Sequence, residues 1–282
     1  MNSTFETVII FIIILMILGI VVQTNENTTD KIVKTQEIDN IEKLLSETAD
    51  YLINNPGEPA NWNEYMKGHA GLGIQNSEGL NIPNSVNYSK LIALGKNYDQ
   101  FVFKDLFDSK LKTSIELLPQ QSSIESVKIG DWDDGDEIFA VNRMVKCDFY
   151  KNYVIKDFEE GGKCNHGHDQ SRCSCNYFKI FKGNILKSDY YLLICGGEDL
   201  DYILDTTRVV KDRYWQTPSS DVIYLNPEIN FYEDTSAVVF VHLNKPNAKA
   251  VLISVPKDFD LSYLNYDYFR MNECQFILKA WY

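Results

Sequence analysis

The chain has 282 residues, enough for about one or two domains with a substantial hydrophobic core. It carries 27 Lys and Arg against 40 Asp and Glu, a formal net charge of −13. Proteins that bind nucleic acid or dock on an anionic lipid surface present a basic face, so this balance argues against both classes. The 17 Tyr and 15 Phe favour β structure, because aromatic side chains suit the half-buried surface of a sheet.

The first 25 residues predict a membrane anchor. Val8 to Val22 are all apolar or Gly, and Glu6 is the one charge at the edge of this segment. A membrane-spanning helix needs about 17–25 such residues. A cleaved secretory signal is the alternative, but "MNSTFE" has no Lys or Arg and "GIVVQT" is a poor cleavage site. We therefore expect residues 1–25 to be an uncleaved, single-pass anchor in the cell membrane, with the lipid bilayer as a partner.

The sequence contains opposing signals for the orientation of this anchor. Lys31 and Lys34 follow the apolar segment, which by itself favours a large domain inside the cell. Long domains cross largely regardless of such charges. Six cysteines and the glycosylation triplets that begin at Asn27 and Asn87 favour the outside. We expect the domain that follows the anchor to lie outside the cell.

Residues 26–56 predict an amphipathic stem helix. The polar "TNENTTD" interrupts the apolar pattern, and Thr29 or Asp30 is a suitable N-cap for a new helix that is either separate from the anchor or continuous with it. One apolar stripe then recurs at helical spacing, at Ile38, Ile41, Leu45, Thr48, Ala49 and Leu52. The sequence "NNPG" at 54–57 ends the helix. A single stripe indicates a helix that lies against a domain without being enclosed by it.

Residues 57–282 predict a β-rich head. Within 57–110 we expect structured loops and two short helices, from Tyr88 to Lys96 and from Tyr98 to Phe107. Within 111–282, eleven short segments rich in Val, Ile, Tyr and Phe are separated by turn residues, which is typical of an antiparallel sandwich or of two packed sheets. The expected fold class is α+β, with a transmembrane or stem helix, a sandwich-like head and a few short helices.

The order of these segments resembles the membrane-anchored, pilin-like surface proteins of archaea. The resemblance rests on the apolar stem, "PGEPANW", "GLGI", "GLNIPNSVNYSKLIALGK", "SIELLP", "AVNRMV", "YYLLICG" and the terminal "ILKAW". It covers nearly the whole chain, and its motifs are structural. It implies a type IV pilin-like architecture, with an N-terminal helical stem and a β-rich head outside the membrane.

The resemblance also implies an assembly role for Glu6. In type IV pilins a Glu at this place pairs with the N-terminal amine of a neighbouring pilin-like subunit, and a carboxylate near lipid is costly unless it is paired. A Glu6 that merely lies among lipid head groups is the alternative. "MNST" lacks the basic residue and the Gly or Ala that precede the cleavage point of prepilins. An accessory surface protein that does not polymerise is therefore the alternative to a filament subunit.

A Cys/His insertion at 160–176 contains the most reactive side chains. "CNHGHDQSRCSC" holds five potential metal ligands: Cys164, His166, His168, Cys173 and Cys175. Tetrahedral zinc takes four nitrogen or sulfur ligands, although Cys-x-Cys and His-x-His are tighter than the spacings of common zinc motifs. Disulfide bonds are the alternative, since six cysteines permit three bridges in fifteen ways: Cys147, Cys164, Cys173, Cys175, Cys195 and Cys274. Free thiols are the third interpretation.

An acidic segment, "GDWDDGDE", is a second candidate ion site. It groups five acidic side chains, and calcium loops use such oxygen clusters: Asp131, Asp133, Asp134, Asp136 and Glu137. The full twelve-residue calcium-loop pattern is absent, and Asp-Gly is a common hairpin turn. A solvated turn is therefore the alternative, and no cofactor beyond a zinc or calcium ion is expected.

The sequence predicts a protein that is not an enzyme. It contains neither Gly-x-Ser-x-Gly nor His-Glu-x-x-His, and "GGEDLD" has no phosphate-loop Lys, so no nucleotide is expected as a partner. Cys147 or Cys195 could pair with His242 as nucleophile and base, but nothing in the sequence positions them, and we expect His69 and His242 to be structural. We expect a structural or adhesive cell-surface protein, with a tethered glycan- or protein-binding module as the alternative and a tethered hydrolase as a third.

Overall fold

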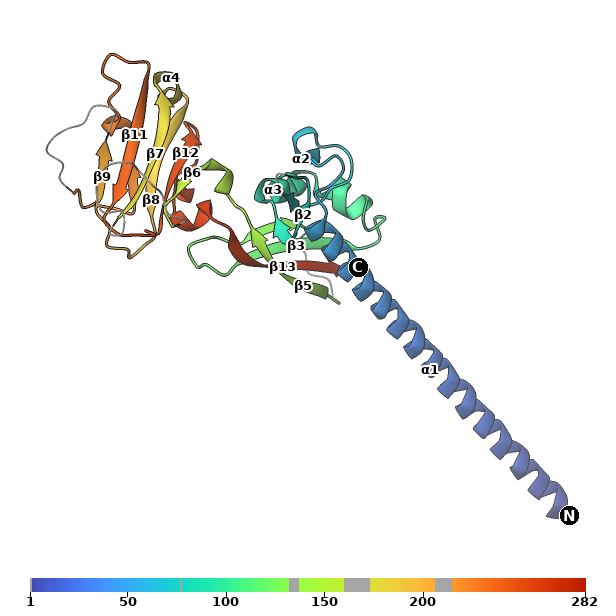
Figure 1. Ribbon diagram of the computed structural model, residues 1–282. Helices are drawn as coiled ribbons and strands as arrows, with labels where there is room; N and C mark the ends of the chain where they lie inside the picture. The colour runs from blue at the N-terminus through green and yellow to red at the C-terminus, as the bar shows by residue number, and fades with distance from the viewer. Residues whose placement is uncertain (1, 77, 132–136, 160–172, 206–214) are drawn as a thin grey trace.

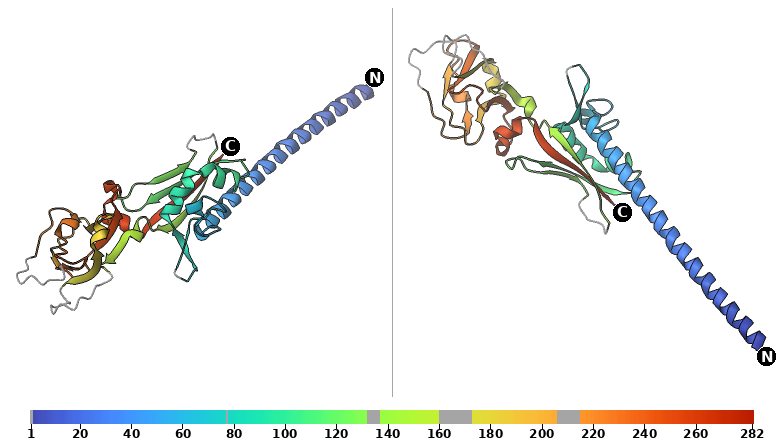
Figure 2. Two further views of the ribbon diagram at one scale, coloured as in Figure 1. Left: turned by 90° about the horizontal axis from the view of Figure 1, so that it is seen from above. Right: turned by 60° about the horizontal axis from the view of Figure 1, so that its bottom comes forward.

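The computed structural model describes the chain except residues 1, 77, 132–136, 160–172 and 206–214, and of residues 2–10, 12, 13 and 27 it describes the backbone alone. The described part is α+β, with one long N-terminal helix, two lobes rich in strands and several short helices (Figure 1). Figure 2 shows that the helix projects away from both lobes in every view. The second lobe lies at the opposite end of the molecule from the N-terminus (Figure 1).

Helix α1 (Asn2–Asn54) runs unbroken through the polar segment, so the stem helix is continuous with the helix that precedes it. The hydroxyls of Thr24, Thr28 and Thr29 each donate to the carbonyl four residues earlier, at 2.7–2.8 Å. Such bonds satisfy the hydroxyl inside a helix, where it would otherwise compete with the backbone. The expected N-cap at Thr29 or Asp30 is therefore wrong, whereas the expected end of the helix near Asn54 is confirmed.

The last turns of α1 pack on the hydrophobic core of the first lobe. Leu45, Ala49 and Leu52 are fully buried, and Ile38 is the first residue of the helix to pack on the same hydrophobic core. These residues recur at intervals of three, four and seven, so they form one face of the helix. The predicted apolar stripe is confirmed.

The first lobe is built on a six-stranded sheet in the order β1-β2-β5-β13-β3-β4. All of its strand pairs are antiparallel except β2 and β5, which are parallel. Its strands are β1 (Gly73–Gln75), β2 (Asn81–Val86), β3 (Lys112–Pro119), β4 (Val127–Gly130), β5 (Phe139–Cys147) and β13 (Asn272–Trp281). Strands β1 and β2 fall where we expected loops, because their residues lack the run of β-branched side chains that marks the other strands.

Short helices complete the first lobe: α2 (Trp62–Tyr65), α3 (Tyr88–Lys96) and the π-helical turn η1 (Asp99–Lys104). Asn87 caps α3 by accepting a hydrogen bond from the Lys90 backbone N–H at 3.0 Å, and the predicted bounds of this helix are confirmed. The fully buried Trp62 donates its ring N–H to the Gly71 carbonyl at 2.8 Å. This bond fixes the loop that follows α1 onto the lobe.

The second lobe contains two further sheets, in the orders β10-β8-β12-β6 and β7-β11-β9, and all of their pairs are antiparallel. One hydrophobic core draws on both sheets, including Leu192 and Leu252 from the first and Val239 and Val241 from the second. The strands are β6 (Val154–Asp157), β7 (Ser174–Phe181), β8 (Ser188–Ile194), β9 (Tyr202–Asp205), β10 (Val222–Tyr224), β11 (Ser236–Leu243) and β12 (Ala250–Pro256). The remaining helical turns are α4 (Lys182–Ile185), η2 (Lys151–Tyr153), η3 (Asn226–Glu228), η4 (Leu261–Tyr263) and η5 (Tyr266–Phe269).

The second lobe is an insertion between two neighbouring strands of the first. The chain leaves the first lobe after β5 and returns as β13, which pairs with β5 and β3 (Figure 1). Aromatic side chains fill the junction: the Tyr150 ring lies 5.3 Å from Tyr88, 5.1 Å from Phe259 and 5.5 Å from Tyr263, between centroids. Each of the eleven predicted segments contains a strand, from β3 to β13, but the strands form three sheets where we expected two.

Candidate functional site

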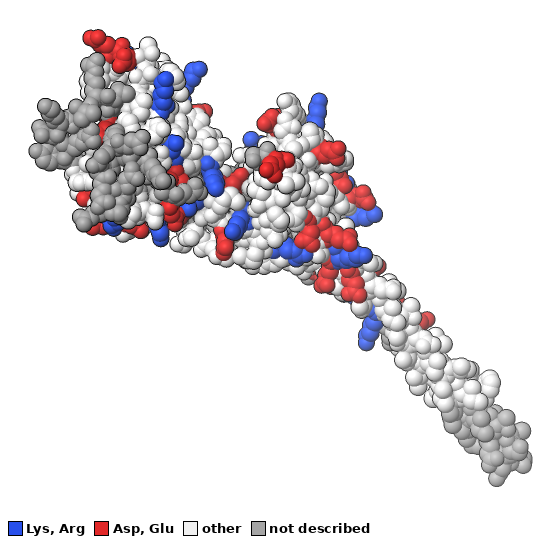
Figure 3. Space-filling model, in the orientation of Figure 1, with Lys and Arg blue, Asp and Glu red and all other residues white. Residues whose placement is uncertain are grey.

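The apolar part of α1 is a surface that the described head leaves uncovered. Its described side chains are 47–65% exposed: Phe11, Ile14, Leu15, Met16, Ile17, Leu18, Ile20, Val21 and Val22. Large exposed apolar surfaces are rare in isolated soluble domains and mark contact with lipid or with other proteins. Figure 3 shows this part of the helix without acidic or basic side chains, whereas charged residues gather where the helix meets the first lobe.

Within the described residues, no helix has both the length and the apolar content that a membrane crossing requires. The backbone of Glu6 belongs to α1, and the side chain predicted to act in assembly lies outside the described residues.

A two-point ion pair ties α1 to the first lobe. The Arg143 Nε donates to Asp50 Oδ1 at 2.8 Å and its Nη2 donates to Asp50 Oδ2 at 3.1 Å; Nη2 also donates to Ser46 Oγ at 2.7 Å. The hydrogen bond from Arg143 lowers the pKa of Asp50 below its usual value. Arg143 belongs to "AVNRMV" on β5, so this segment positions the stem on the sheet.

A second candidate site lies on the three-stranded sheet of the second lobe. Along β11 the side chains of Val239 and Val241 enter the shared core, so His242 belongs to the opposite face of the strand. His242 is directly opposite Cys175 on β7. Asp205 on β9 is opposite Phe240, which is two residues before His242 and therefore on the same face of β11. Residues opposite one another on adjacent antiparallel strands place their side chains in contact. Three strands thus bring a thiol, an imidazole and a carboxylate together.

The contacts within this group are short and buried. His242 Nδ1 lies 3.0 Å from Cys175 Sγ, and His242 Nε2 lies 3.2 Å from Asp205 Oδ2. Cys173 Sγ lies 3.6 Å from Cys175 Sγ, which is too far for a disulfide bond of about 2.05 Å. All four residues are at most 9% exposed. We call Cys173, Cys175, Asp205 and His242 the thiol–histidine cluster.

The structure brings together only part of the predicted Cys/His insertion. Cys164, His166 and His168 lie outside the described residues, while Cys173 and Cys175 are in the thiol–histidine cluster. Sequence reasoning missed Asp205 and treated His242 as structural. The available signal was the alternation of "AVVFVHLN", which places a histidine on the face of β11 away from the core.

Disulfide bonds are not found for the other cysteines. Cys147 and Cys274 are free, buried thiols on the neighbouring strands β5 and β13, and Cys195 is a free, partly buried thiol after β8. The structure therefore shows no disulfide bond at these three residues. Burial raises the pKa of Cys147 well above its usual value and that of Cys274 to about 12, so both stay protonated and unreactive at neutral pH.

The acidic segment shows ion pairs at its two described ends. Asp131 lies 3.4 Å from the Lys112 ammonium, and Glu137 lies 3.6 Å from that of Lys34 on α1. Asp133, Asp134 and Asp136, the remaining predicted calcium ligands, lie outside the described residues. In the part of the chain that the structure describes, no three His, Cys, Asp or Glu side chains are grouped so that they could hold a metal ion as they stand.

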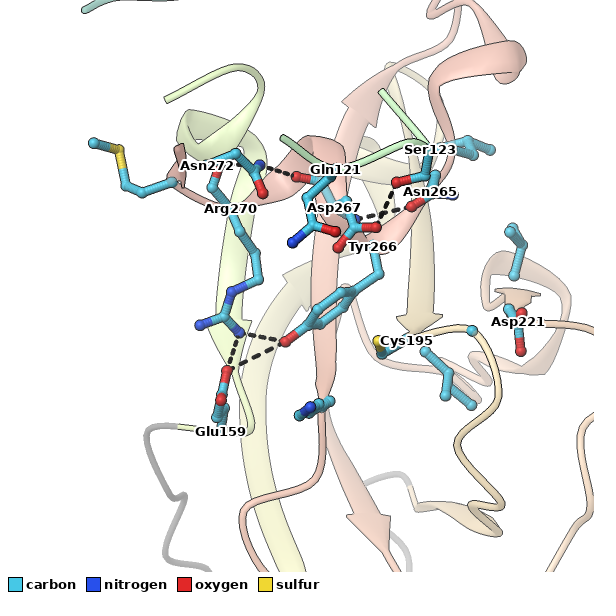
Figure 4. A pocket seen from close by; sticks show the side chains of 16 residues that line it. Gln121, Ser123, Glu159, Cys195, Asp221, Asn265, Tyr266, Asp267, Arg270 and Asn272 are labelled. Carbon is cyan, nitrogen blue, oxygen red and sulfur yellow. Dashed lines mark hydrogen bonds and ion pairs between the residues drawn. The ribbon is translucent and has the colours of Figure 1, made fainter. Parts of the chain in front are cut away.

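A polar pocket of about 810 Å³ lies at the junction of the two lobes (Figure 4). Its wall includes Arg270, whose guanidinium lies 2.5 Å from the Glu159 carboxylate and donates to the Tyr266 hydroxyl. Figure 4 shows these three side chains on one side of the pocket and Asp221 on the other. We call it the junction pocket, and its mixture of charged and hydroxyl groups suits a polar ligand.

Among the described residues that line the junction pocket, Cys195 is the one with a thiol. Burial raises the pKa of this thiol, which leaves it protonated at neutral pH and therefore a weak nucleophile. Neither His242 nor His69 lines this pocket. The sequence left open a pairing of Cys147 or Cys195 with His242, and the thiol that the structure places beside His242 is that of Cys175.

Comparison of the chain with protein-family models, with curated proteins and with solved structures finds no match.

Proposed function

We propose that this chain is a cell-surface structural or adhesive protein with a pilin-like arrangement, not an enzyme. The observation that carries the proposal is the uncovered apolar half of α1, which stands clear of a folded head. Such a surface is stable only where lipid chains or other helices cover it. On this proposal residues 1–25 lie in the cell membrane or in a filament core, and the head lies outside the cell.

The geometry of α1 supports a stem that can pack laterally against copies of itself. The helix is straight and continuous from Asn2 to Asn54, about 80 Å long at 1.5 Å per residue (Figure 1). Its packing on the hydrophobic core of the head begins at Ile38, and the Lys34–Glu137 ion pair lies just before that point, so more than half of its length is available to neighbours. In a filament, Glu6 would pair with the N-terminal amine of the next pilin-like subunit, since a carboxylate buried among apolar helices needs a cation.

The head completes the proposed architecture. The two sheets of the second lobe share one hydrophobic core, which supports a sandwich-like arrangement for that lobe. The six-stranded sheet of the first lobe holds the stem through the buried stripe of α1 and through Arg143.

The first experiment separates sheared surface filaments from membranes and probes both fractions for this chain, with the N-terminal residue identified by mass spectrometry. A filament subunit is expected in the sheared fraction with a trimmed N-terminus. Recovery of the chain in neither fraction would contradict the proposal. Recovery in membranes alone, starting at Met1 or Asn2, would contradict assembly and leave a tethered protein.

A matched pair of variants tests the role of Glu6. Glu6→Ala is expected to abolish filament incorporation, because the subunit loses its pairing carboxylate. Glu26→Ala removes an exposed carboxylate from the same helix and is expected to assemble normally. Both variants are expected to leave the unfolding of the head unchanged, and equal assembly of the two would refute the Glu6 role.

The junction pocket favours the second candidate, a tethered binding module that does not polymerise. Its Arg270, Glu159 and Tyr266 groups offer hydrogen bonds to a glycan or to a polar peptide. This candidate predicts that Arg270→Ala weakens adhesion of cells that carry the chain and that Glu6→Ala does not. Arg143→Ala, an arginine outside the pocket, is the control.

A further inference from the structure

We propose that Cys173, Cys175 and His242 bind one zinc ion on the outer face of the three-stranded sheet, with Asp205 orienting the imidazole. The site is built from strands β7, β9 and β11 and is separate from the stem and from the junction pocket. It concerns the second lobe alone, so it stands or falls independently of how the stem is used.

The fold places these donors together without long loops. Cys175 and His242 are partners in the ladder between β7 and β11. Cys173 directly precedes β7, and its Sγ lies 3.6 Å from that of Cys175. The ladder fixes the backbones, which preorganises the side chains for a common ligand. Sulfur and imidazole nitrogen are the donors that zinc prefers.

Two separations between the donors can be compared with those of tetrahedral zinc. Two thiolates at about 2.3 Å from zinc lie roughly 3.7 Å apart, and the two Sγ atoms here are 3.6 Å apart. His242 Nδ1 is 3.0 Å from Cys175 Sγ, a hydrogen-bond distance, where zinc would hold nitrogen and sulfur roughly 3.5 Å apart. Zinc binding therefore replaces the shared proton and needs a side-chain shift of about half an ångström.

Asp205 supplies the partner that a zinc-binding histidine normally has. A metal-bound imidazole usually donates its other ring N–H to a carboxylate, which fixes its tautomer. Here His242 Nε2 lies 3.2 Å from Asp205 Oδ2, so the proton is on Nε2 and Nδ1 presents its lone pair to the sulfur side. The tautomer that suits the carboxylate is also the one that suits zinc.

Burial favours a metal over a catalytic thiol. Cys175 is 1% exposed, and a thiol that attacks a substrate needs access that this position does not give. Two thiolates neutralise the charge of one Zn²⁺, and binding releases their two protons to solvent. The three protein ligands leave the fourth position of a tetrahedral zinc ion to a solvent molecule. The ion would join β7 to β11, with β9 held through Asp205.

The test measures metal on the full chain, purified in detergent under anaerobic, reducing conditions and supplied with Zn²⁺ and then with Co²⁺. We expect about one zinc per chain after removal of the excess. With cobalt we expect a thiolate-to-cobalt charge-transfer band and the strong visible bands of tetrahedral coordination. Absence of retained zinc in the wild-type chain would overturn the proposal without any variant, as would a mass lower by two hydrogens that shows Cys173 and Cys175 joined to each other.

Variants then assign the ligands. Cys175→Ser and His242→Ala are expected to lose the retained zinc, whereas Cys195→Ser, which changes a free thiol outside the cluster, should keep it. Asp205→Asn should retain the fold and weaken zinc binding about 10- to 100-fold. Full zinc retention by a Cys173→Ser/Cys175→Ser chain, or equal loss in Cys195→Ser, would refute the assignment. Circular dichroism of each variant separates loss of zinc from loss of fold.

Discussion

The two halves of α1 have the same backbone structure and opposite surroundings. Near its C-terminal end, Leu45, Ala49 and Leu52 are fully enclosed by the first lobe. Near its N-terminal end, Leu15 and Ile17 are more than half exposed. Most helix stability in proteins comes from tertiary packing and not from helix propensity. The folded head therefore stabilises only the C-terminal half of this helix. The described apolar side chains from Phe11 to Val22, which we call the bare half, are not covered by the described head.

The largest expected difference between the two halves is in the stability of the head. Leu45→Ala should lower the free energy of unfolding by about 2–5 kcal/mol, because it leaves a cavity beneath the helix. Leu18→Ala in the bare half should change it by less than about 0.5 kcal/mol. Urea unfolding of the full-length chain in detergent, followed by tryptophan fluorescence, measures both. Equal effects would show that the bare half packs on the head.

Association with membranes or filaments should instead depend on the N-terminal half of α1 and not on the half that packs on the head. Leu15→Arg should release the chain from membranes or filaments, since an Arg at the centre of a spanning helix costs about 2.5–3.5 kcal/mol. Val33→Arg, on an exposed position of the same helix beyond the apolar segment, is the matched control and should stay associated. Fractionation of cells that express each variant is the measurement. Unchanged association of Leu15→Arg would refute the proposed anchoring.

The pH dependence of stability should separate the head from the bare helix. Burial raises the pKa of Asp148 to about 6, although the carboxylate accepts hydrogen bonds from the Tyr88 backbone N–H and the Asn87 amide. The folded head therefore binds this proton more tightly than the unfolded chain does, and the contribution of Asp148 to stability falls as the pH rises from about 4 to about 6. The slope is at most about 1.4 kcal/mol per pH unit.

Asp148→Asn tests this assignment, because it keeps an oxygen for the Tyr88 N–H and cannot ionise. The difference in unfolding free energy between wild type and variant should vary between about pH 4 and pH 6 and level off above pH 6. A constant difference across that range would contradict the raised pKa. The helicity of the bare half, which is distant from Asp148, should not follow this titration.

The smallest expected effect is at the ion pair that joins the C-terminal half of α1 to the first lobe. Arg143→Ala should lower the unfolding free energy by about 1 kcal/mol or less, because its ion pair with Asp50 is largely solvent-exposed. Asp50→Asn should lose most of the same amount, and the double variant should cost little more than either single one. Additive losses would show that the two residues act independently. The hydrogen bond to Ser46 gives Arg143 a small contribution of its own.

Local pattern in the sequence determined most of the elements. The spacing of Ile41, Leu45 and Leu52 predicted which face of the stem is buried, and the runs of Val, Ile, Tyr and Phe located all eleven strands from β3 to β13. The bounds of α3 were also predictable, because Asn87 is a standard N-cap before a helical apolar pattern. These features depend on residues close together in the chain, so the sequence alone reveals them.

Only the tertiary structure decided how distant segments meet. The return of β13 between β5 and β3, which makes the second lobe an insertion, depends on pairing across more than a hundred residues. The contacts of His242 with Cys175 and Asp205 likewise depend on which strands are neighbours and in which register. A shift of one residue in that register would turn His242 to the opposite face, and no local pattern specifies the partner strand. The sequence thus determined which side chains each strand offers, and the packing of the sheets decided which of them meet.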